Sequence, residues 1–275
     1  MRFYTLFSLV SAAAALPSQI RRADSFTVQP WIAASAGDSR GPCPMMNTLA
    51  NHGYLYVVCN HLTRRPSASG YARSITDIET NSPRNGRNIT IEMFGEAINT
   101  ALGWDTQVGV IPANGAFAAL NATHTIDLEQ LNNRPAGLER PASLARADDS
   151  NDVVPARVQA VLDDSDDKKY LTAASLGASR HRVELTSPLT PAQQSPAQGE
   201  AGFILALMLD GTVPAAGTEG VDYTQLKAFK NWVQEWLTFE RLPVELGWRP
   251  STRQVSFTDL APINAAIKKA QASLS

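Results

Sequence analysis

The amino-acid sequence predicts an all-α protein, folded as one compact helical domain. Apolar residues recur at helical spacing in a segment that ends at Gly103, namely at Ile91, Phe94, Ile98 and Leu102. A second segment carries a wide apolar stripe formed by Phe229, Trp232, Val233, Trp236 and Leu237. The alternation of apolar and polar residues that is typical of strands is scarce, and no internal repeat is present. These observations favour helices packed around one core.

The remaining helices are predicted from their start and stop signals. Pro44 can occupy the first position of a helix that Gly53 ends. Asp127 followed by Gln130 resembles a capping box for a short helix.

Two helices are expected in the C-terminal half. Ser195-Pro196-Ala197-Gln198 is a stronger capping box, with proline at the first helical position, and it opens an apolar run over residues 201–209. Asp210-Gly211 closes that run. The last helix is expected over residues 260–272.

The beginning of the chain is typical of a secretory signal. Arg2 is followed by an apolar stretch over residues 3–10 and by four alanines before Pro17, so residues 1–17 are expected to be removed. The stretch is too short to span a bilayer, and no later segment is apolar for long enough. Asn88 and Asn121 lie in glycosylation sequons. We therefore expect a secreted protein whose residues 18–275 form one domain.

Composition narrows the function classes. A formal net charge of −2 argues against a nucleic-acid partner. Two cysteines cannot build a disulfide framework, so the fold must depend on its core and on any cofactor.

Cys43 is the residue that points most directly to chemistry. It lies in Pro42-Cys43-Pro44, at the expected start of a helix, where a thiolate would face unpaired N–H groups and the positive end of the helix dipole. That position should lower the thiol pKa and make the sulfur a good metal ligand. Taken alone, a single cysteine is more often a small buried hydrophobe.

The residues around Cys43 favour the first interpretation. The run from Asp38-Ser39-Arg40 through Cys43 to residues 49–55 closely resembles the proximal motif of the fungal heme-thiolate peroxidases, the family of chloroperoxidase and the short unspecific peroxygenases. The resemblance implies that Cys43 is the axial thiolate of a heme b iron, a ligand that pushes electron density toward O–O cleavage. It also implies the family's fold, a helical domain around a buried heme.

A second motif covers residues 139–146. At this place the family has Glu-His-Asp-x-Ser-Leu-Ser-Arg, whose Glu and Ser bind Mg²⁺ or Mn²⁺ beside a heme propionate, and the resemblance implies the same role for Glu139 and Ser143. A hard cation takes oxygen ligands and neutralises a propionate that would be costly to bury. Arg140 and Pro141 replace the family's His and Asp, so Arg140 either supplies a fixed positive charge near the acid–base carboxylate or points to solvent.

The acid–base carboxylate is expected on a distal helix. Gly199-Glu200-Ala201 resembles the family's Gly-Glu-Ala segment, which makes Glu200 the candidate proton carrier. Apolar neighbours such as Phe203, Ile204 and Leu207 would raise its pKa. The alternative is an ordinary glutamate in the first turns of a helix.

Other polar motifs are expected to be structural. Residues 163–167 are more typical of a solvated loop than of a cation site. Glu240 and Arg241 mark a helix end before a proline. His52 is expected to form hydrogen bonds at a helix end. The other histidines lack ligand spacing, so a histidine-ligated heme or zinc site is the poorer interpretation: His61, His124 and His181.

Together these residues predict a secreted heme-thiolate peroxidase or peroxygenase that uses hydrogen peroxide to oxidise or oxygenate a small apolar or aromatic substrate. One alternative is a degenerate family member that binds heme and has weak or no oxygenating activity, because the His and Asp partners are missing. A non-catalytic secreted glycoprotein is the other alternative. Neither a nucleic acid nor a membrane is expected as a partner.

Residues 56–82 are predicted not to belong to the functional protein. Family members run directly from Tyr-Leu into Pro-Arg-x-Gly-Arg, whereas here this stretch separates Tyr54-Leu55 from residues 83–87. Its codons permit an in-frame intron, with a GTATGT donor within residues 55–57, a CTGAC branch sequence in Thr76-Asp77 and an ACAG acceptor in Asn81-Ser82. The alternative is a genuine surface loop, since long insertions are thermodynamically tolerable.

Overall fold

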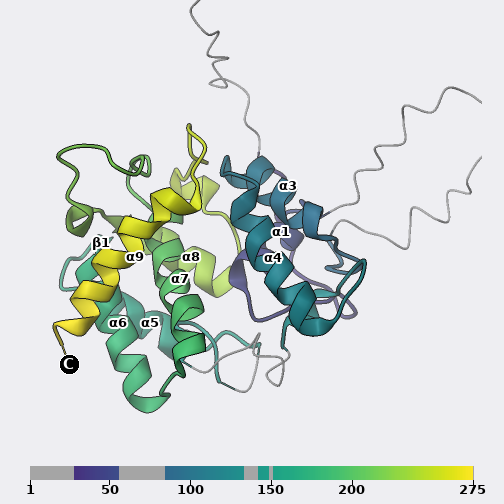
Figure 1. Cartoon of the computed structure of the whole chain (residues 1–275), viewed down its shortest axis with the longest axis horizontal. Coiled ribbons are helices and arrows are strands. Elements are labelled where there is room, and N and C mark those ends of the chain that lie inside the picture. Colours follow the sequence, from purple (N-terminus) through teal and green to yellow (C-terminus); the bar gives the residue numbers. More distant parts are fainter. Residues whose placement is uncertain (1–27, 56–83, 133–141, 149–150, 275) are drawn as a thin grey trace, which may run out of the picture.

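The computed structural model describes residues 28–55, 84–132, 142–148 and 151–274, and in these residues the protein is mostly helical, as predicted. Figure 1 shows one compact domain with two groups of helices. The first group, on the right of the view, consists of α1 (Pro44–Asn51), α3 (Ile91–Leu102) and α4 (Gln107–Leu120). The second group consists of α5 (Pro155–Asp163), α6 (Ala173–Thr186), α7 (Pro191–Leu207), α8 (Lys230–Phe239) and α9 (Phe257–Ala272).

Short elements complete the described fold. Strands β1 (Tyr170–Leu171) and β2 (Ala228–Phe229) pair antiparallel, with Tyr170 opposite Phe229. Three 3₁₀ turns are η2 (Leu128–Asn132), η3 (Tyr223–Gln225) and η4 (Val244–Leu246).

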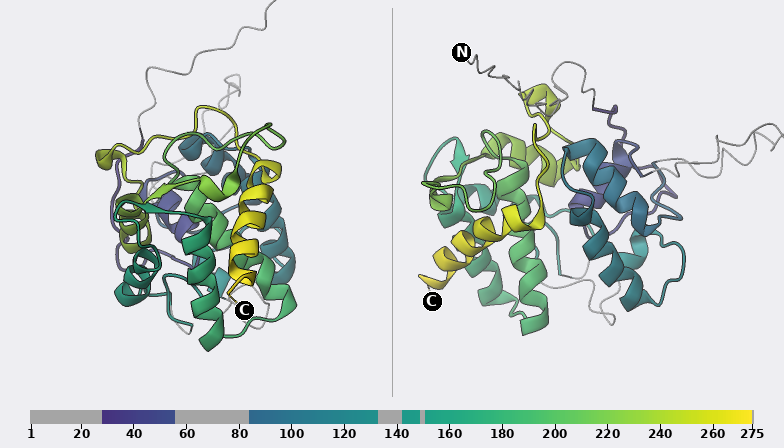
Figure 2. Two further views of the ribbon diagram at one scale, coloured as in Figure 1. Left: turned by 90° about the vertical axis from the view of Figure 1, so that its left-hand side faces the viewer. Right: turned by 45° about the horizontal axis from the view of Figure 1, so that its top comes forward.

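Glycines allow the closest helix contacts in both groups. In the first, a Cβ on Gly109 of α4 would lie 2.5 Å from the backbone oxygen of Phe94 in α3. In the second, a Cβ on Gly177 of α6 would lie 2.8 Å from the Cβ of Ala270 in α9. Helix α9 packs against both α6 and α7, and Figure 2 shows these helices from two further directions.

Trp236 joins α1 to the second group of helices. Trp236 of α8 is buried and donates its indole N–H to Oγ1 of Thr48 in α1, over 3.0 Å. Val233 and Leu237 are buried beside it, so the apolar stripe predicted for this helix is part of the core. This contact holds the middle of α1 against α8.

The predicted start of α7, at Pro196, is five residues too late. The helix begins at Pro191, and the capping box is formed by Thr190 and Gln193, whose Oε1 accepts the N–H of Thr190 at 3.0 Å. Thr-Pro-Ala-Gln at 190–193 and Ser-Pro-Ala-Gln at 195–198 are equivalent as start signals. The upstream signal is the one used, and Pro196 lies inside the helix.

The other predicted boundaries fit the structure more closely. Residues 91–102 form α3 with Gly103 in the left-handed conformation at its end, and Pro44 is the first residue of α1. The last helix begins at Phe257, three residues before the predicted start. Asp127 precedes a 3₁₀ turn that contains Gln130, where an α-helix was predicted, although the side chain of Gln130 does accept the N–H of Asp127 over 2.7 Å.

Candidate active site

Cys43 is the N-cap residue of α1 and has an extended backbone, with Pro44 at the first helical position. The N–H groups of Met46 and Met45 act on the sulfur as the sequence predicts, and by themselves they lower its pKa. Burial is the larger effect, and it raises the pKa of the Cys43 thiol. The pKa of the half-buried thiol is therefore raised where the sequence predicted it to be lowered, because desolvation by the surrounding protein outweighs the donors at the helix start.

Asn47, on the first turn of α1, holds the loop that carries Cys43. Its Oδ1 accepts the N–H of Gly41 over 3.0 Å, and its Nδ2 donates to the carbonyl of Gly41 over 2.8 Å. Nδ2 also donates to Oε1 of Glu240 over 2.7 Å. Gly41 is required there, because a Cβ would lie 2.3 Å from the backbone oxygen of Leu128. The backbone at Gly41, two residues before Cys43, is thereby held by Asn47 on one side and by Leu128 on the other.

Glu240 and Arg146 form a buried ion pair on the same side of the molecule. Arg146 donates through Nη2 to Oε1 of Glu240, and its side chain is 3% exposed. Burial raises the pKa of Glu240, although Arg146 and Asn47 act in the opposite direction. The predicted helix end at Glu240 is present, with its φ of 50° in the left-handed region, but the side chain also has this electrostatic role.

Arg146 has one buried N–H that lacks a partner among the described residues, Nη1. The guanidinium is close enough to Cys43 to lower the pKa of the thiol. Arg146 also lines a cleft of about 290 Å³ together with Arg40 and Asn151. A buried guanidinium N–H without a partner is costly, and a carboxylate is the group that satisfies it best.

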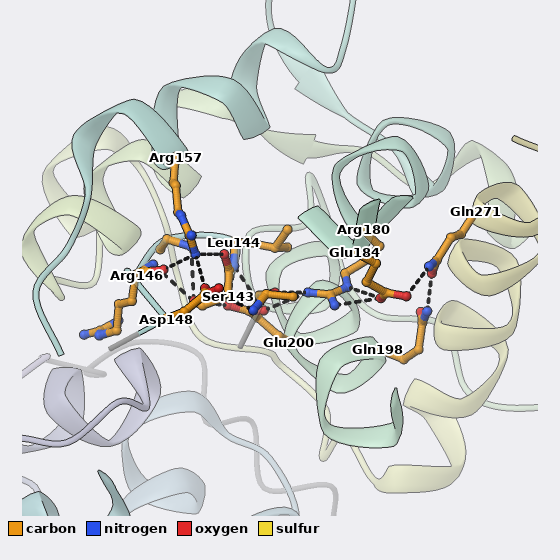
Figure 3. Close-up of polar contacts among 12 residues, drawn as sticks. Ser143, Leu144, Arg146, Asp148, Arg157, Arg180, Glu184, Gln198, Glu200 and Gln271 are labelled. Carbon is orange, nitrogen blue, oxygen red and sulfur yellow. Dashed lines mark hydrogen bonds and ion pairs between the residues drawn. The ribbon is translucent and has the colours of Figure 1, made fainter. Parts of the chain in front are cut away.

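Glu200 lies on α7 and its carboxylate is bound by donors from two other segments (Figure 3). Ser143 Oγ donates to Oε1 over 3.1 Å, and the N–H of Leu144 reaches Oε1 and Oε2 at 3.1 and 3.3 Å. Arg180 of α6 lies on the other side, with Nη1 at 3.3 Å from Oε2. The structure thus brings together two residues that were predicted for the site, Ser143 and Glu200.

The carboxylate of Glu200 is bound by hydroxyl, amide and guanidinium donors, which the sequence did not predict. Ile204 and Leu207 are buried in the core. Phe203 stacks on Trp104 with ring centroids 5.7 Å apart. The loop at 142–148 and α6 supply these donors, and residues on the same helix could not indicate them.

Ser143 is engaged on every side. Its hydroxyl donates to Glu200 and accepts the N–H groups of Ala145 and Arg146, at 3.3 and 3.1 Å. A hydroxyl has one hydrogen and two lone pairs, so none is left for a cation in this arrangement. Glu139 and Arg140 lie outside the described residues, and a Mg²⁺ or Mn²⁺ ion at Glu139 and Ser143 stays a prediction.

The loop that carries Ser143 is held by Asp148 and by Arg157 of α5. Asp148 accepts from Arg157 Nη1 at 2.8 Å and from the N–H of Ala142 at 3.2 Å, and it also pairs with the hydroxyl of Ser187. Burial by itself would raise the pKa of Asp148, but these hydrogen bonds outweigh it and hold the pKa below its usual value. Arg157 also donates to the carbonyl of Ser143 over 3.2 Å. The loop is therefore preorganised around the carboxylate of Glu200.

Three further side chains belong to the candidate site and were not predicted from the sequence: Arg180, Arg146 and Glu240. A partial signal existed for Arg180, which stands four residues before Glu184 on one helix face. That signal is usually a surface pair, and only the tertiary structure shows that the side chain of Arg180 is 0% exposed.

The remaining predicted polar residues are structural where they are described. His52 pairs Nδ1 with the carbonyl of Gln29 at 2.6 Å and accepts the N–H of Leu242 at Nε2 over 3.1 Å. Asp164, in the acidic run, accepts from Arg182 at 2.7 Å, so that residue anchors α6. In the ranges that the structure describes, no group of three or more His, Cys, Asp or Glu side chains could hold a metal ion. No described helix is long and apolar enough to cross a membrane.

Comparison with known proteins places these residues in a family. The model of "Peroxidase, family 2" matches residues 29–56 and 82–253, so Cys43, Ser143 and Glu200 all lie inside the match, which passes over residues 57–81. Chloroperoxidase from Leptoxyphium fumago is 27% identical over 294 aligned positions, which cover 94% of this chain and 70% of that protein. The chain belongs to peroxidase family 2 and is a peroxidase-type oxidoreductase.

Proposed function

We propose that the protein is a secreted heme-thiolate peroxidase or peroxygenase, which uses hydrogen peroxide to oxidise or oxygenate small apolar or aromatic compounds. The observation that carries this proposal is the position of Cys43 at the start of α1, where the N–H groups of Met45 and Met46 act on its sulfur. Bound to iron, a thiolate needs such donors, because they compensate its charge in a buried place. When bound, heme b would supply the electrons for cleavage of the peroxide O–O bond.

The donor set of the described residues fits a heme. Cys43 offers one thiol ligand, and Arg146 offers the unpaired buried N–H that a propionate carboxylate would satisfy. Without such a carboxylate, that N–H has no hydrogen-bond partner among the described residues. Cys43 would therefore ligate the heme iron, and Arg146 would bind a heme propionate.

Glu200 would move the proton. Its carboxylate can take a proton from hydrogen peroxide and deliver it to the departing oxygen, which leaves as water. Ser143 and Leu144 hold the oxygens from one side, so little reorganisation is needed when the proton moves. Phe203 is three residues further along α7 and half-buried, which supports contact with an aromatic or apolar substrate.

A member with weak or no oxygenating activity is the second candidate. It is favoured by the replacement of the family's His and Asp with Arg140 and Pro141. Peroxide-dependent oxygenation of a panel of aromatic and aliphatic compounds separates the two candidates.

A non-catalytic glycoprotein is the third candidate. Asn88 and Asn121, the two acceptor asparagines, are both exposed, which favours glycosylation in a secreted chain. This candidate predicts a protein without bound heme, whereas the proposed function predicts one heme for each chain after expression with heme supplied.

The proposed function is tested most simply at Glu200. Glu200→Gln should retain heme and lose peroxide turnover by on the order of a hundredfold, because positioned acid–base groups contribute that much. Glu219→Gln, at an exposed glutamate, is the matched control and should turn over normally. Normal turnover by Glu200→Gln would show that another carboxylate carries the proton.

A further inference from the structure

We propose that Arg180 is a positioning residue for the peroxidase reaction, because its buried guanidinium fixes the orientation of the Glu200 carboxylate. The inference rests on the proposed role of Glu200 as the proton carrier. It assigns to a residue of α6 the fixed positive charge that the sequence analysis considered for Arg140.

Arg180 is enclosed by acceptors on two sides. Its Nη1 donates to the carbonyl of Ala142 over 2.7 Å and lies 3.3 Å from Oε2 of Glu200. Its Nε and Nη2 donate to Oε1 of Glu184, at 3.2 and 2.7 Å. The planar guanidinium fork therefore contacts Glu184 and Glu200 at the same time, and its side chain is 0% exposed.

The guanidinium is itself held in place. Glu184 accepts the Nε2 amide of Gln271 at Oε2 over 2.9 Å, and Gln271 in turn accepts from Gln198 (Figure 3). Gln198 lies on α7, two residues before Glu200, and Gln271 lies on α9. A chain of polar contacts thus runs from α7 through α9 and α6 back to α7, and it fixes Arg180 relative to the helix that carries Glu200.

The consequence is a carboxylate with its two oxygens held by different elements. Ser143 holds Oε1, Arg180 holds Oε2, and the N–H of Leu144 reaches both. Arg180 also binds the carbonyl of Ala142, so it connects the loop at 142–148 to α6. Loss of the guanidinium would remove the donor that α6 supplies to Oε2 and so change the orientation of the carboxylate, and a misplacement of about 1 Å can cost on the order of a hundredfold in rate.

The buried ion pairs of Arg180 favour a role for this residue beyond folding. A buried ion pair recovers its desolvation cost only with good geometry and further hydrogen bonds, so it is weak evidence for stability. Arg180 already has a carboxylate partner in Glu184, at 2.7 Å, which is shorter than its 3.3 Å distance to Glu200. The second contact of Arg180, with Glu200, helps to orient the Glu200 carboxylate, which Ser143 and Leu144 hold from the opposite side.

Arg182 provides a matched control on the same helix. It pairs with Asp164 over 2.7 Å, is 38% exposed and has no contact with Glu200. Arg180→Lys keeps the charge but loses the fork that reaches Glu184 and Glu200 together. Arg180→Gln combined with Glu184→Gln removes the charge without leaving Glu184 unpaired, which keeps the test usable if Arg180→Gln alone does not fold.

The experiment measures heme content, kcat and KM for the organic substrate, and the urea midpoint of unfolding. In Arg180→Lys we expect heme content and KM to stay at the wild-type value, while kcat falls at least about tenfold. The double variant should lose more of kcat than Arg180→Lys, and Arg182→Lys should lose none. The midpoint shifts caused by Arg180→Lys and Glu200→Gln should be non-additive, because the two side chains are in contact.

Normal kcat in both Arg180 variants, or additive midpoint shifts, would overturn the positioning role. Failure of the proposed function looks different: Glu200→Gln would then turn over normally, or the wild-type protein would bind no heme. An inactive Glu200→Gln together with fully active Arg180 variants would refute the role of Arg180 alone.

Discussion

The hydroxyl of Ser143 donates a hydrogen bond over 3.1 Å to Oε1 of Glu200, a residue 57 positions further along the chain. The Oγ atom of Ser143 also accepts the N–H groups of Ala145 and Arg146. Ser143 therefore links the turn that it stabilises to the carboxylate that we propose moves the proton.

Replacement of this hydroxyl should separate two roles. Ser143→Ala removes one donor to Glu200 and should lower peroxide turnover by about tenfold, at a cost in stability of about 1 kcal/mol. Ser143→Thr keeps the hydroxyl and is the control. Turnover, heme content and bound divalent metal are measured on the same samples. A loss of metal and heme with Ser143→Ala would favour the cation site predicted from Glu139 and Ser143 over the role seen here.

The ion pair between Arg146 and Glu240 should be important for stability. Glu240→Ala leaves a guanidinium that is 3% exposed without its partner, so we expect the free energy of unfolding to fall by about 3 kcal/mol. The control is Glu235→Ala, which removes the partner of Arg241, an arginine that is 35% exposed, and should cost about 1 kcal/mol or less. Urea titration measures both, and equal losses would contradict the prediction.

Stability should also decrease in mild acid because of His52. Burial lowers the pKa of His52, whose Nε2 accepts the N–H of Leu242 in the neutral form. The unfolded chain binds the proton more readily, so this contribution is complete above about pH 6.5 and is lost as the pH falls toward the folded-state pKa.

The check is urea unfolding at pH 7 and pH 5. The wild-type protein should lose more stability between these values than His52→Asn does. His124→Asn alters an exposed histidine and should follow the wild-type protein. A loss in His52→Asn equal to that of the wild type would assign the acid sensitivity to other groups.

Residues 56–82 give a prediction about the transcript. The family match passes over residues 57–81, which supports the proposal that this segment, which lies outside the described residues, is a retained intron. We expect mature messenger RNA that joins Leu55 directly to Pro83, and a protein expressed without the segment should bind heme at least as well as the full chain. Messenger RNA that keeps the segment, with Cys59 peptides recovered from secreted protein, would contradict this.

The sequence predicts local structure well where a few neighbouring residues decide it. The start of α1 at Pro44 and the end of α3 at Gly103 follow from backbone preferences that act over one turn. In contrast, α4 was missed, because Gly109 and Pro112 obscure its pattern and a close contact with α3 stabilises it. Tertiary packing overrides propensity there.

For the site, the sequence and the family resemblance point to Cys43, Ser143 and Glu200, but not to the partners that set their chemistry. Arg180 comes from another helix, and Arg146 meets Glu240 across 94 positions. Such pairs depend on how helices pack, which no local pattern encodes. The raised pKa of Cys43 has the same origin, because it depends on burial by distant parts of the chain.

Thiolate ligation by Cys43 is tested most directly by the absorption spectrum of the reduced protein under carbon monoxide, recorded for the wild-type protein, Cys43→Ala and Cys59→Ala. We predict the red-shifted Soret band that a thiolate ligand produces in the wild-type protein and in Cys59→Ala, and its loss in Cys43→Ala. A Cys43→Ala protein that keeps the wild-type band, or a wild-type protein that binds heme without showing that band, would contradict the assignment.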